Sequence, residues 1–250
     1  MEAWKLVVAA VAGALAGVMN SVAGGGTLIT YPALVWLGLD PIVANATSTL
    51  ALWPGYVAAA LGFRKEVART RGWVVLLAIP SLVGGLIGAF ILLRTPSRTF
   101  SFIVPFLVLG ATIMLAFQIR RPPPRRSRGR WAPFGAVSFQ LAAAVYGGYF
   151  GAGLGFMLLV GFGLMGLRDV LEMSALKNAL TVLINGVALG YFIASGAIRW
   201  TDGLVMAAGA AAGGFGGTVI ARRVGDRTVR IAVVVIGLAV SVGLMVRAFA

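Results

Sequence analysis

The chain has 250 residues, of which 60% are hydrophobic and only 11% are charged, and its formal net charge is +14. Its mean hydropathy is +0.96. A soluble domain is roughly 45–50% apolar and about 25% charged, so the composition predicts an all-α polytopic membrane protein. The sequence contains no cysteine and no histidine, which excludes disulfides, thiolate metal sites and histidine proton shuttles. We therefore expect no cofactor, no metal and no enzymatic activity.

Eight uncharged segments are candidates for membrane spans. A helix rises about 1.5 Å per residue, so about 20 residues cross a hydrocarbon core of about 30 Å. The segments are residues 6–39, 41–63, 73–93, 99–119, 131–167, 178–198, 203–221 and 231–246. The positive charges fall mainly in the connections between them, as the positive-inside rule describes for cytoplasmic loops. We therefore expect a lipid bilayer around the chain and no nucleic-acid partner.

The first segment, 6–39, is too long for one straight span and contains the stretch Asn20-Ser21-Val22-Ala23-Gly24-Gly25-Gly26-Thr27. Three successive glycines favour a break, because glycine loses the most backbone freedom when it is ordered. Irregular backbone at membrane depth is tolerated only where protein buries it or where it lines a watery cavity. A helix that begins after such a break directs unpaired N–H groups and a positive dipole end into the membrane. We predict an anion site formed by Asn20, Ser21, Gly24, Gly25, Gly26 and Thr27.

A polar cluster follows in the next segment, shortly after Pro41. Its members are Asn45, Thr47, Ser48 and Thr49. Thr49 lies about 12 Å along the helix from its start, near the bilayer midplane. Such side chains either form hydrogen bonds between helices or line a pathway. We predict that they line the path of an anion.

Two basic loops divide the chain. Loop 64–71 and loop 120–130 are both expected in the cytoplasm, with the two spans 73–93 and 99–119 between them. The second loop also contains three successive prolines, which stiffen a linker. We predict a first transmembrane repeat at 1–119, a cytoplasmic linker at 120–131 and a second transmembrane repeat at 132–250.

Matching glycines support this division. Gly38 and Gly62 recur in the second half, at one common offset, as Gly166 and Gly190. The pair Arg98-Thr99 recurs at nearly the same offset, as does the group Gly84-Gly85 with Gly88. Many secondary transporters consist of two such repeats, with the substrate site where they meet. We predict two tandem repeats of about four transmembrane helices, each with a broken, Gly-rich first helix.

The number of crossings depends on the broken segments. If each one crosses the membrane once, the chain has eight spans, parallel halves and both termini in the cytoplasm. If each one is a hairpin, the chain has ten spans and inverted halves. Loop charge does not decide, because Arg222, Arg223 and Arg227 fall outside the cell in the eight-span arrangement. We favour eight crossings.

The second half repeats the interruption within 131–167, where glycines gather between positions 147 and 155. By the same reasoning we predict anion binding by Gly151, Gly153 and Gly155. Lys177 follows the expected N-cap Asp169 closely enough to lie as deep as Thr49.

A lysine at the centre of a span costs about 2.5–3.5 kcal/mol, so Lys177 should face a cavity or a partner. Glu172 is five positions away, which is poor spacing for a helical ion pair. We predict that Lys177 binds the anion, the alternative being a side chain that extends to the membrane surface. Asn178, Thr181 and Asn185 follow on one helix face, and we predict that this polar stripe continues the path.

The Asn20–Thr27 stretch resembles the signature of the TauE/SafE (sulfite exporter, TSUP) family of membrane permeases, and the run from Gly38 to Thr49 is similar to that family as well. The length, the twofold repeat and the basic central loop also fit. The resemblance implies a multi-pass cell-membrane protein that exports or takes up sulfur-containing anions such as sulfite or organosulfonates. The second half has Gly148-Tyr149 where the first has Asn20-Ser21, so the two half-sites should differ.

We therefore expect a transporter of small sulfur-containing anions, working as an exporter by alternating access around a site at the midplane. The alternatives are an anion channel, a permease for another small organic anion, and a structural membrane protein. The sequence leaves open which anion is carried, whether it is imported or exported, the coupling ion, and whether the chain forms a homo-oligomer.

Overall fold

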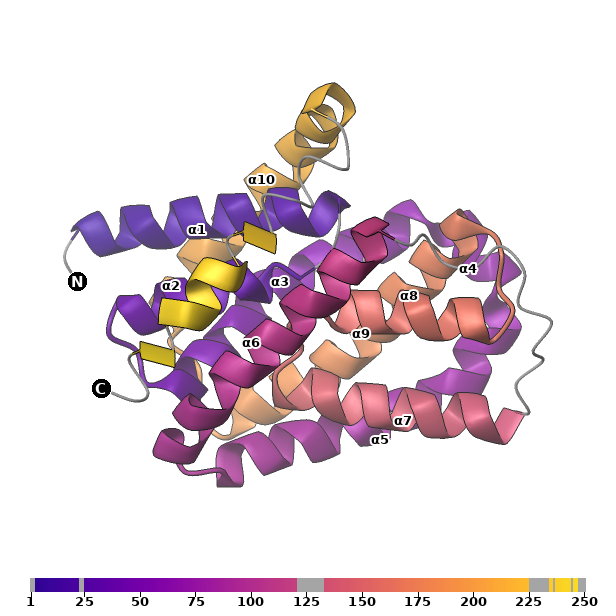
Figure 1. The fold of residues 1–250 in the computed structure, drawn as a ribbon, viewed down its shortest axis with the longest axis horizontal. Helices are drawn as coiled ribbons and strands as arrows, with labels where there is room; N and C mark the ends of the chain where they lie inside the picture. Colours follow the sequence, from indigo (N-terminus) through magenta and orange to yellow (C-terminus); the bar gives the residue numbers. More distant parts are fainter. Residues whose placement is uncertain are drawn as a thin grey trace.

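The computed structural model describes residues 3–22, 25–120, 133–224, 234–235, 237–243 and 245–246. Within these ranges every regular element is a helix. The elements are α1 (Ala3–Val22), α2 (Thr27–Trp36), α3 (Pro41–Gly62), α4 (Arg64–Arg69), α5 (Arg71–Arg94), α6 (Ser97–Arg120), α7 (Pro133–Tyr149), α8 (Leu154–Leu164), α9 (Val170–Ala194) and α10 (Trp200–Val224). Figure 1 shows their arrangement. The expected helical class is confirmed for the described residues, and most of the predicted linker lies outside them.

Several helices have the length and composition of membrane spans. Among the described residues, the stretches Ala3–Asn20, Arg71–Arg94 and Val170–Ala194 are long and apolar enough to cross a bilayer. Large apolar side chains also point away from the protein, and Val7 on α1 and Ile79 on α5 are more than half exposed. Exposing such side chains to lipid does not carry the free-energy cost of exposing them to water. The outer surface therefore fits a bilayer.

Both interrupted segments fold back on themselves. Trp4 at the start of α1 contacts Trp36 at the end of α2, with ring centroids 5.9 Å apart. In the second half, the Phe139 ring near the start of α7 packs against Gly161 near the end of α8. Each segment is thus a helical hairpin, and the preferred prediction of a single crossing per segment is wrong.

Glycines in the left-handed backbone region allow these reversals. Gly25 has a φ of 91° and Gly151 has a φ of 74°, values that side chains with a Cβ rarely adopt. The chain can therefore turn within a few residues between the long and the short helix. A glycine run indicates that a helix breaks, but not whether the chain continues forward or turns back.

The two halves run through the molecule in opposite directions. α1 and α10 are parallel, since Gly13 packs against Met206 and Gly17, one turn later, packs against Ala210. Going back from α10, the chain reverses at the turn 195–199, at the turn 165–169 and at the α7–α8 break, so α7 is antiparallel to α1. Figure 1 shows this directly: α1 leads inward from the N-terminal side and α7 starts from the opposite side. The arrangement is the inverted one, which the sequence analysis considered but did not prefer.

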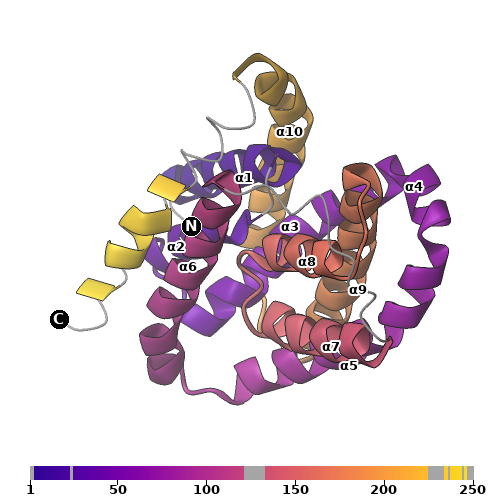
Figure 2. The same ribbon diagram turned by 45° about the vertical axis from the view of Figure 1, so that its right-hand side comes forward.

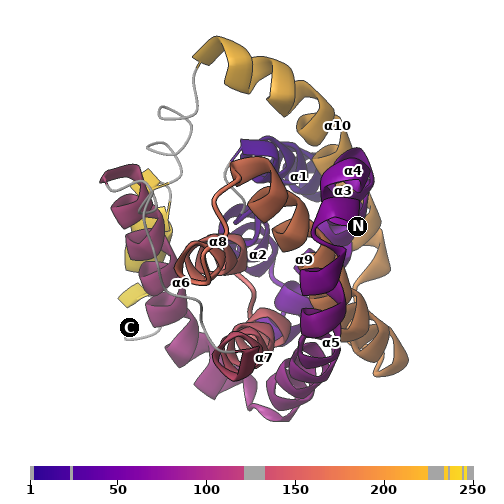
Figure 3. The same cartoon turned by 90° about the vertical axis from the view of Figure 1, so that its right-hand side faces the viewer.

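Long helices from the two halves pack against each other across the molecule. α1 lies along α10, and α5 lies along α7, as Figures 2 and 3 show from two further directions. Both contacts depend on glycine. A Cβ on Gly213 would overlap the Ala14 carbonyl oxygen, and one on Gly88 would overlap that of Val145. Small residues let the two backbones approach this closely.

Helices α3 and α9 cross between these two pairs. The Trp53 indole on α3 donates a hydrogen bond to the Val182 carbonyl oxygen on α9, at 3.2 Å. Each helix begins at an aspartate N-cap, Asp40 for α3 and the predicted Asp169 for α9, whose carboxylate accepts backbone N–H groups of the first turn. The crossing places the middle of both helices beside the two hairpin breaks.

Candidate functional site

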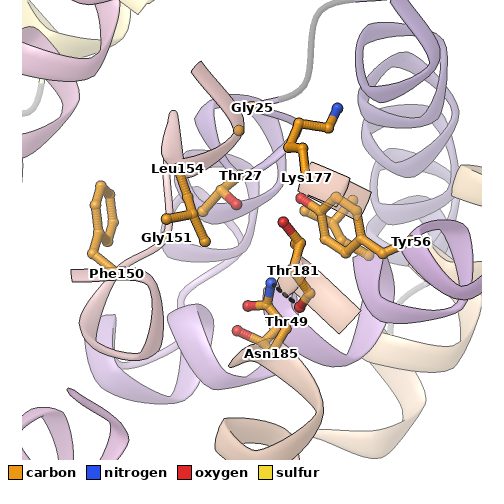
Figure 4. Close-up of a pocket in the computed structure, with 12 residues that line it drawn as sticks. Gly25, Thr27, Thr49, Tyr56, Phe150, Gly151, Leu154, Lys177, Thr181 and Asn185 are labelled. Atoms are coloured by element: carbon orange, nitrogen blue, oxygen red, sulfur yellow. Dashed lines mark hydrogen bonds between the residues drawn. The ribbon is translucent and has the colours of Figure 1, made fainter. Parts of the chain in front are cut away.

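A small cavity lies where the two hairpin breaks face α3 and α9 (Figure 4). Its volume is about 20 Å³, slightly more than the roughly 10–15 Å³ that one water requires. The residues that line it are Gly25, Thr27, Thr49, Leu52, Tyr56, Phe150, Gly151, Leu154, Gly155, Lys177, Thr181 and Asn185. The cavity is therefore narrow and is formed by both halves of the chain.

Several residues predicted for the anion site meet at this cavity. They are Gly25, Thr27, Thr49, Gly151, Gly155, Lys177 and Asn185. Thr27 corresponds to Gly155 and Thr49 corresponds to Lys177, at the same offset that relates Gly38 to Gly166. Corresponding positions of the two halves thus face one another across the same space.

Lys177 lies against the first turn of α8. A methyl group on Gly155 would be 3.3 Å from Cδ of Lys177 and 3.9 Å from its Nζ. Within the described part of the chain, no carboxylate pairs with this ammonium group and no hydrogen bond to it is found; the ion pair present there joins Arg199 and Asp202. The cavity thus contains a cation beside the positive end of a helix, without a counter-ion among the described residues.

Two further polar side chains of α9 share the face of Lys177. Thr181 and Asn185 follow at intervals of four positions, which places all three along one side of the helix. The Thr181 hydroxyl is buried and has no hydrogen-bond partner among the described residues. Asn185 donates to the Thr181 carbonyl oxygen at 3.2 Å. Asn178 is buried but does not line the cavity, since it lies about 100° around the helix from Lys177.

The first N–H groups of α2 are hydrogen-bonded within the first hairpin. The Gly26 amide donates to Oδ1 of Asn20 at 2.8 Å, and the amides of Leu28 and Ile29 donate to the carbonyl oxygens of Gly25 and Gly26. Asn20 and Gly26 therefore stabilise the turn and do not line the cavity. Thr27, one residue further, does.

Gly153 also has a structural role. It is the N-cap of α8 with a φ of 74°, and a Cβ there would lie 2.8 Å from that of Ala111 on α6. Gly24 is outside the described residues, and nothing is described for the side chain of Ser21. Anion binding by these positions stays a prediction.

The polar cluster of α3 mostly joins helices together. Asn45 donates to the Tyr149 carbonyl oxygen at the end of α7, at 3.0 Å. Thr47 accepts the Arg199 amide just before α10, also at 3.0 Å. Ser48 shares a hydrogen bond with Thr30 of α2. Three of the four side chains thus bond to neighbouring elements, and Thr49 alone of the four lines the cavity.

Four lining residues were not predicted: Leu52, Tyr56, Phe150 and Leu154. Leu52 and Tyr56 follow Thr49 by about one and two helical turns, so the helical period alone would place them on the same face. Phe150 and Leu154 belong to the second hairpin break. In Figure 4 these two apolar side chains lie opposite the polar side chains of α3 and α9. The second hairpin break therefore contributes apolar side chains opposite these polar groups.

The chain is similar to known membrane transporters over nearly its whole length. Residues 9–244 match the family model described as "Sulfite exporter TauE/SafE". The "Probable membrane transporter protein ORF9" of Sinorhizobium sp. is 28% identical, over 94% of this chain and 90% of the relative. A "Probable membrane transporter protein" of Haemophilus influenzae is 28% identical, over 89% and 88%. The "Probable membrane transporter protein YfcA" of Escherichia coli K12 is 29% identical, over 92% and 86%.

Proposed function

Because this chain belongs to the sulfite exporter TauE/SafE family of membrane transporters, we propose that it carries a small sulfur-containing anion across the cell membrane. The anion is sulfite or a small organosulfonate, and the direction is export. The binding site is the cavity between the two hairpins. The observation that carries this proposal is the Lys177 ammonium group, which has no counter-ion among the described residues and lies beside the first turn of α8.

The charges around the cavity favour an anion. The N-terminus of a helix carries roughly half a positive charge, and Lys177 adds a full one. No residue that lines the cavity is an aspartate or a glutamate. Two like charges in a medium of low dielectric repel each other, so a bound anion would stabilise both of them. A cation would find no compensating charge on these walls.

Three threonine hydroxyls also belong to residues that line the cavity. Thr27, Thr49 and Thr181 line the cavity together with Lys177, and each hydroxyl can donate one hydrogen bond to an oxyanion. Of these three hydroxyls, the Thr181 hydroxyl gives the strongest support, because it has no partner among the described residues and a buried polar atom without a partner is unusual. The cavity, at about 20 Å³, holds little more than one water and is too small for either sulfite or an organosulfonate, so the site must widen when the substrate enters.

We further propose that the two halves are structural repeats and that the site works by alternating access. Transporters with inverted repeats place their substrate between the repeats and expose it to each side in turn. Since α1 packs along α10 and α5 along α7, the two halves cannot move apart as independent bodies. In this mechanism the two cross-half pairs rock around the hairpins, α3 and α9.

Transport by purified protein in liposomes tests the proposal. We expect saturable uptake of radiolabelled sulfite, with at least a tenfold loss of affinity in Lys177→Ala, because the bound anion loses its charged partner. Lys177→Arg, which keeps the charge, should retain part of the activity. The matched control is Lys65→Ala, at an exposed lysine of α4 that does not line the cavity.

Unchanged sulfite affinity in Lys177→Ala would remove this site from the transport path. Counterflow separates a carrier from the alternative anion channel. A carrier preloaded with unlabelled sulfite accumulates labelled sulfite against its gradient for a time, whereas a channel does not.

A further inference from the structure

Tyr56 is the one aromatic hydroxyl among the residues that line the cavity. It lies on α3, two helical turns after Thr49. In Figure 4 its hydroxyl points into the space between Thr27 and Lys177. The side chain is also hydrogen-bonded to Asn20 at the end of α1. Tyr56 therefore connects the cavity to the first hairpin.

A second hydrogen bond of Asn20 bears on whether the Tyr56 hydroxyl donates to Asn20 or accepts from it. Oδ1 of Asn20 accepts the Gly26 amide at 2.8 Å. Because this oxygen is already occupied by the amide, we infer that Asn20 turns its NH₂ group, which can only donate, toward Tyr56. The phenol oxygen is then the acceptor, and its own proton remains available for another partner. Asn20 thus orients the Tyr56 O–H without touching the cavity itself.

We propose that Tyr56 is a specificity-determining ligand of the transported anion and that Asn20 is its positioning residue. This inference rests on the proposed function. Tyr56, Thr181 and Lys177 all line the same small cavity, and their side chains carry two hydroxyls and one ammonium group. A sulfite or a sulfonate presents three oxygens, each a strong hydrogen-bond acceptor. The site therefore selects anions that accept several hydrogen bonds over weakly accepting anions of the same charge.

The Asn20–Tyr56 pair is present in only one half of the chain. At the offset that relates the two halves, Asn20 corresponds to Gly148 and Tyr56 corresponds to Ile184. Neither counterpart can donate from its side chain. The anion is therefore bound asymmetrically, by the Asn20–Tyr56 pair from the first half and by Lys177 and Thr181 from the second.

Binding of two anions to the purified, full-length protein tests the inference. Sulfite is a strong hydrogen-bond acceptor and perchlorate is a weak one. We expect Tyr56→Phe, which keeps the ring, to weaken sulfite binding by roughly tenfold, the effect of a hydrogen bond to a charged group. Perchlorate binding should be unchanged. Fluorotyrosine at position 56, a stronger donor of nearly the same size, should tighten sulfite binding, which keeps the test open if the phenylalanine variant does not fold.

A double-mutant cycle tests the role of Asn20. In Asn20→Asp the carboxylate still accepts the Gly26 amide but also accepts the Tyr56 proton, which removes that donor from the cavity. Tyr56→Phe should then cause no further loss of sulfite affinity, and additive losses would overturn the positioning role. Equal sulfite affinities of Tyr56→Phe and the parent protein would overturn the ligand role, provided that Lys177→Ala has lost binding. If Lys177→Ala also binds normally, the proposed function itself fails.

Discussion

At the scale of single residues, the site depends on how one lysine is held within a span. Lys177 would be costly at this depth without compensation. Its aliphatic stem packs beside Gly155, which has no side chain to displace it. Lys177 lines the cavity between the hairpins at this contact. Gly155 therefore acts through the position of Lys177 and not only through its own backbone.

This contact yields a prediction for Gly155→Ala. The new methyl group would lie 3.3 Å from Cδ of Lys177, so the lysine must shift by a few tenths of an ångström. We expect sulfite affinity to fall by about tenfold while thermal stability holds or rises, because alanine is the better helix former. The control is Gly110→Ala on α6, where a Cβ would meet no atom within 4 Å. Unchanged affinity in Gly155→Ala would show that the lysine adapts freely.

At the scale of elements, glycine has two separate functions in this protein. In the hairpin breaks, Gly25 and Gly151 adopt positive φ and reverse the chain. In the long helices, Gly13 and Gly213 let α1 and α10 approach closely. The sequence shows both groups only as abundant glycines. Their functions differ because the first concerns backbone conformation and the second concerns the space between two helices.

The helix crossings yield a second prediction. In Gly213→Ala the methyl group would overlap the Ala14 carbonyl oxygen, so α1 and α10 must separate. Overpacking costs typically about 1–3 kcal/mol, and we expect the unfolding temperature of the purified protein to fall by several degrees. Gly190→Ala on α9 meets no atom within 4 Å and should be neutral or slightly stabilising. Equal unfolding temperatures of the two variants would contradict the close crossing.

At the scale of the whole molecule, inversion of the halves places basic connections such as α3–α4 and α8–α9 on one side, while Arg94, Arg98 and Arg199 lie on the other. The ends of α3, α6, α8 and α10 then point to the same side of the membrane. Arg64, Lys65 and Arg168 belong to the connections there. Arg222 and Arg223 at the end of α10, which did not fit the eight-span arrangement, join them. By the positive-inside rule we predict that this side is cytoplasmic and that the N-terminus is outside.

Cysteine labelling checks this orientation, because the chain contains no cysteine of its own. Ser195→Cys lies in the exposed turn before α10, and Lys65→Cys lies on the exposed surface of α4. In spheroplasts, a membrane-impermeant maleimide should label the first variant and not the second. Inside-out vesicles should give the opposite result. Labelling of Lys65→Cys in intact spheroplasts would reverse the assignment.

Local patterns were sufficient for part of this picture. The uncharged runs predicted the helices, the glycine clusters predicted the two breaks, and the distance of Lys177 from its N-cap predicted the same depth as that of Thr49. Each of these follows from residue type and from the constant rise of a helix, which act within one segment. The family resemblance was also carried by short stretches, and the match over residues 9–244 confirms it.

Other features depend on contacts between segments far apart in the sequence. Whether a broken helix continues or turns back depends on the packing of its two arms, and the contact of Trp4 with Trp36 shows that α2 turns back. Which face of α3 meets the cavity depends on its neighbours, so Asn45, Thr47 and Ser48 bond to other helices while Thr49 and Tyr56 line the space. Sequence period defines the faces of a helix, but only the tertiary structure decides which of them is turned toward the cavity.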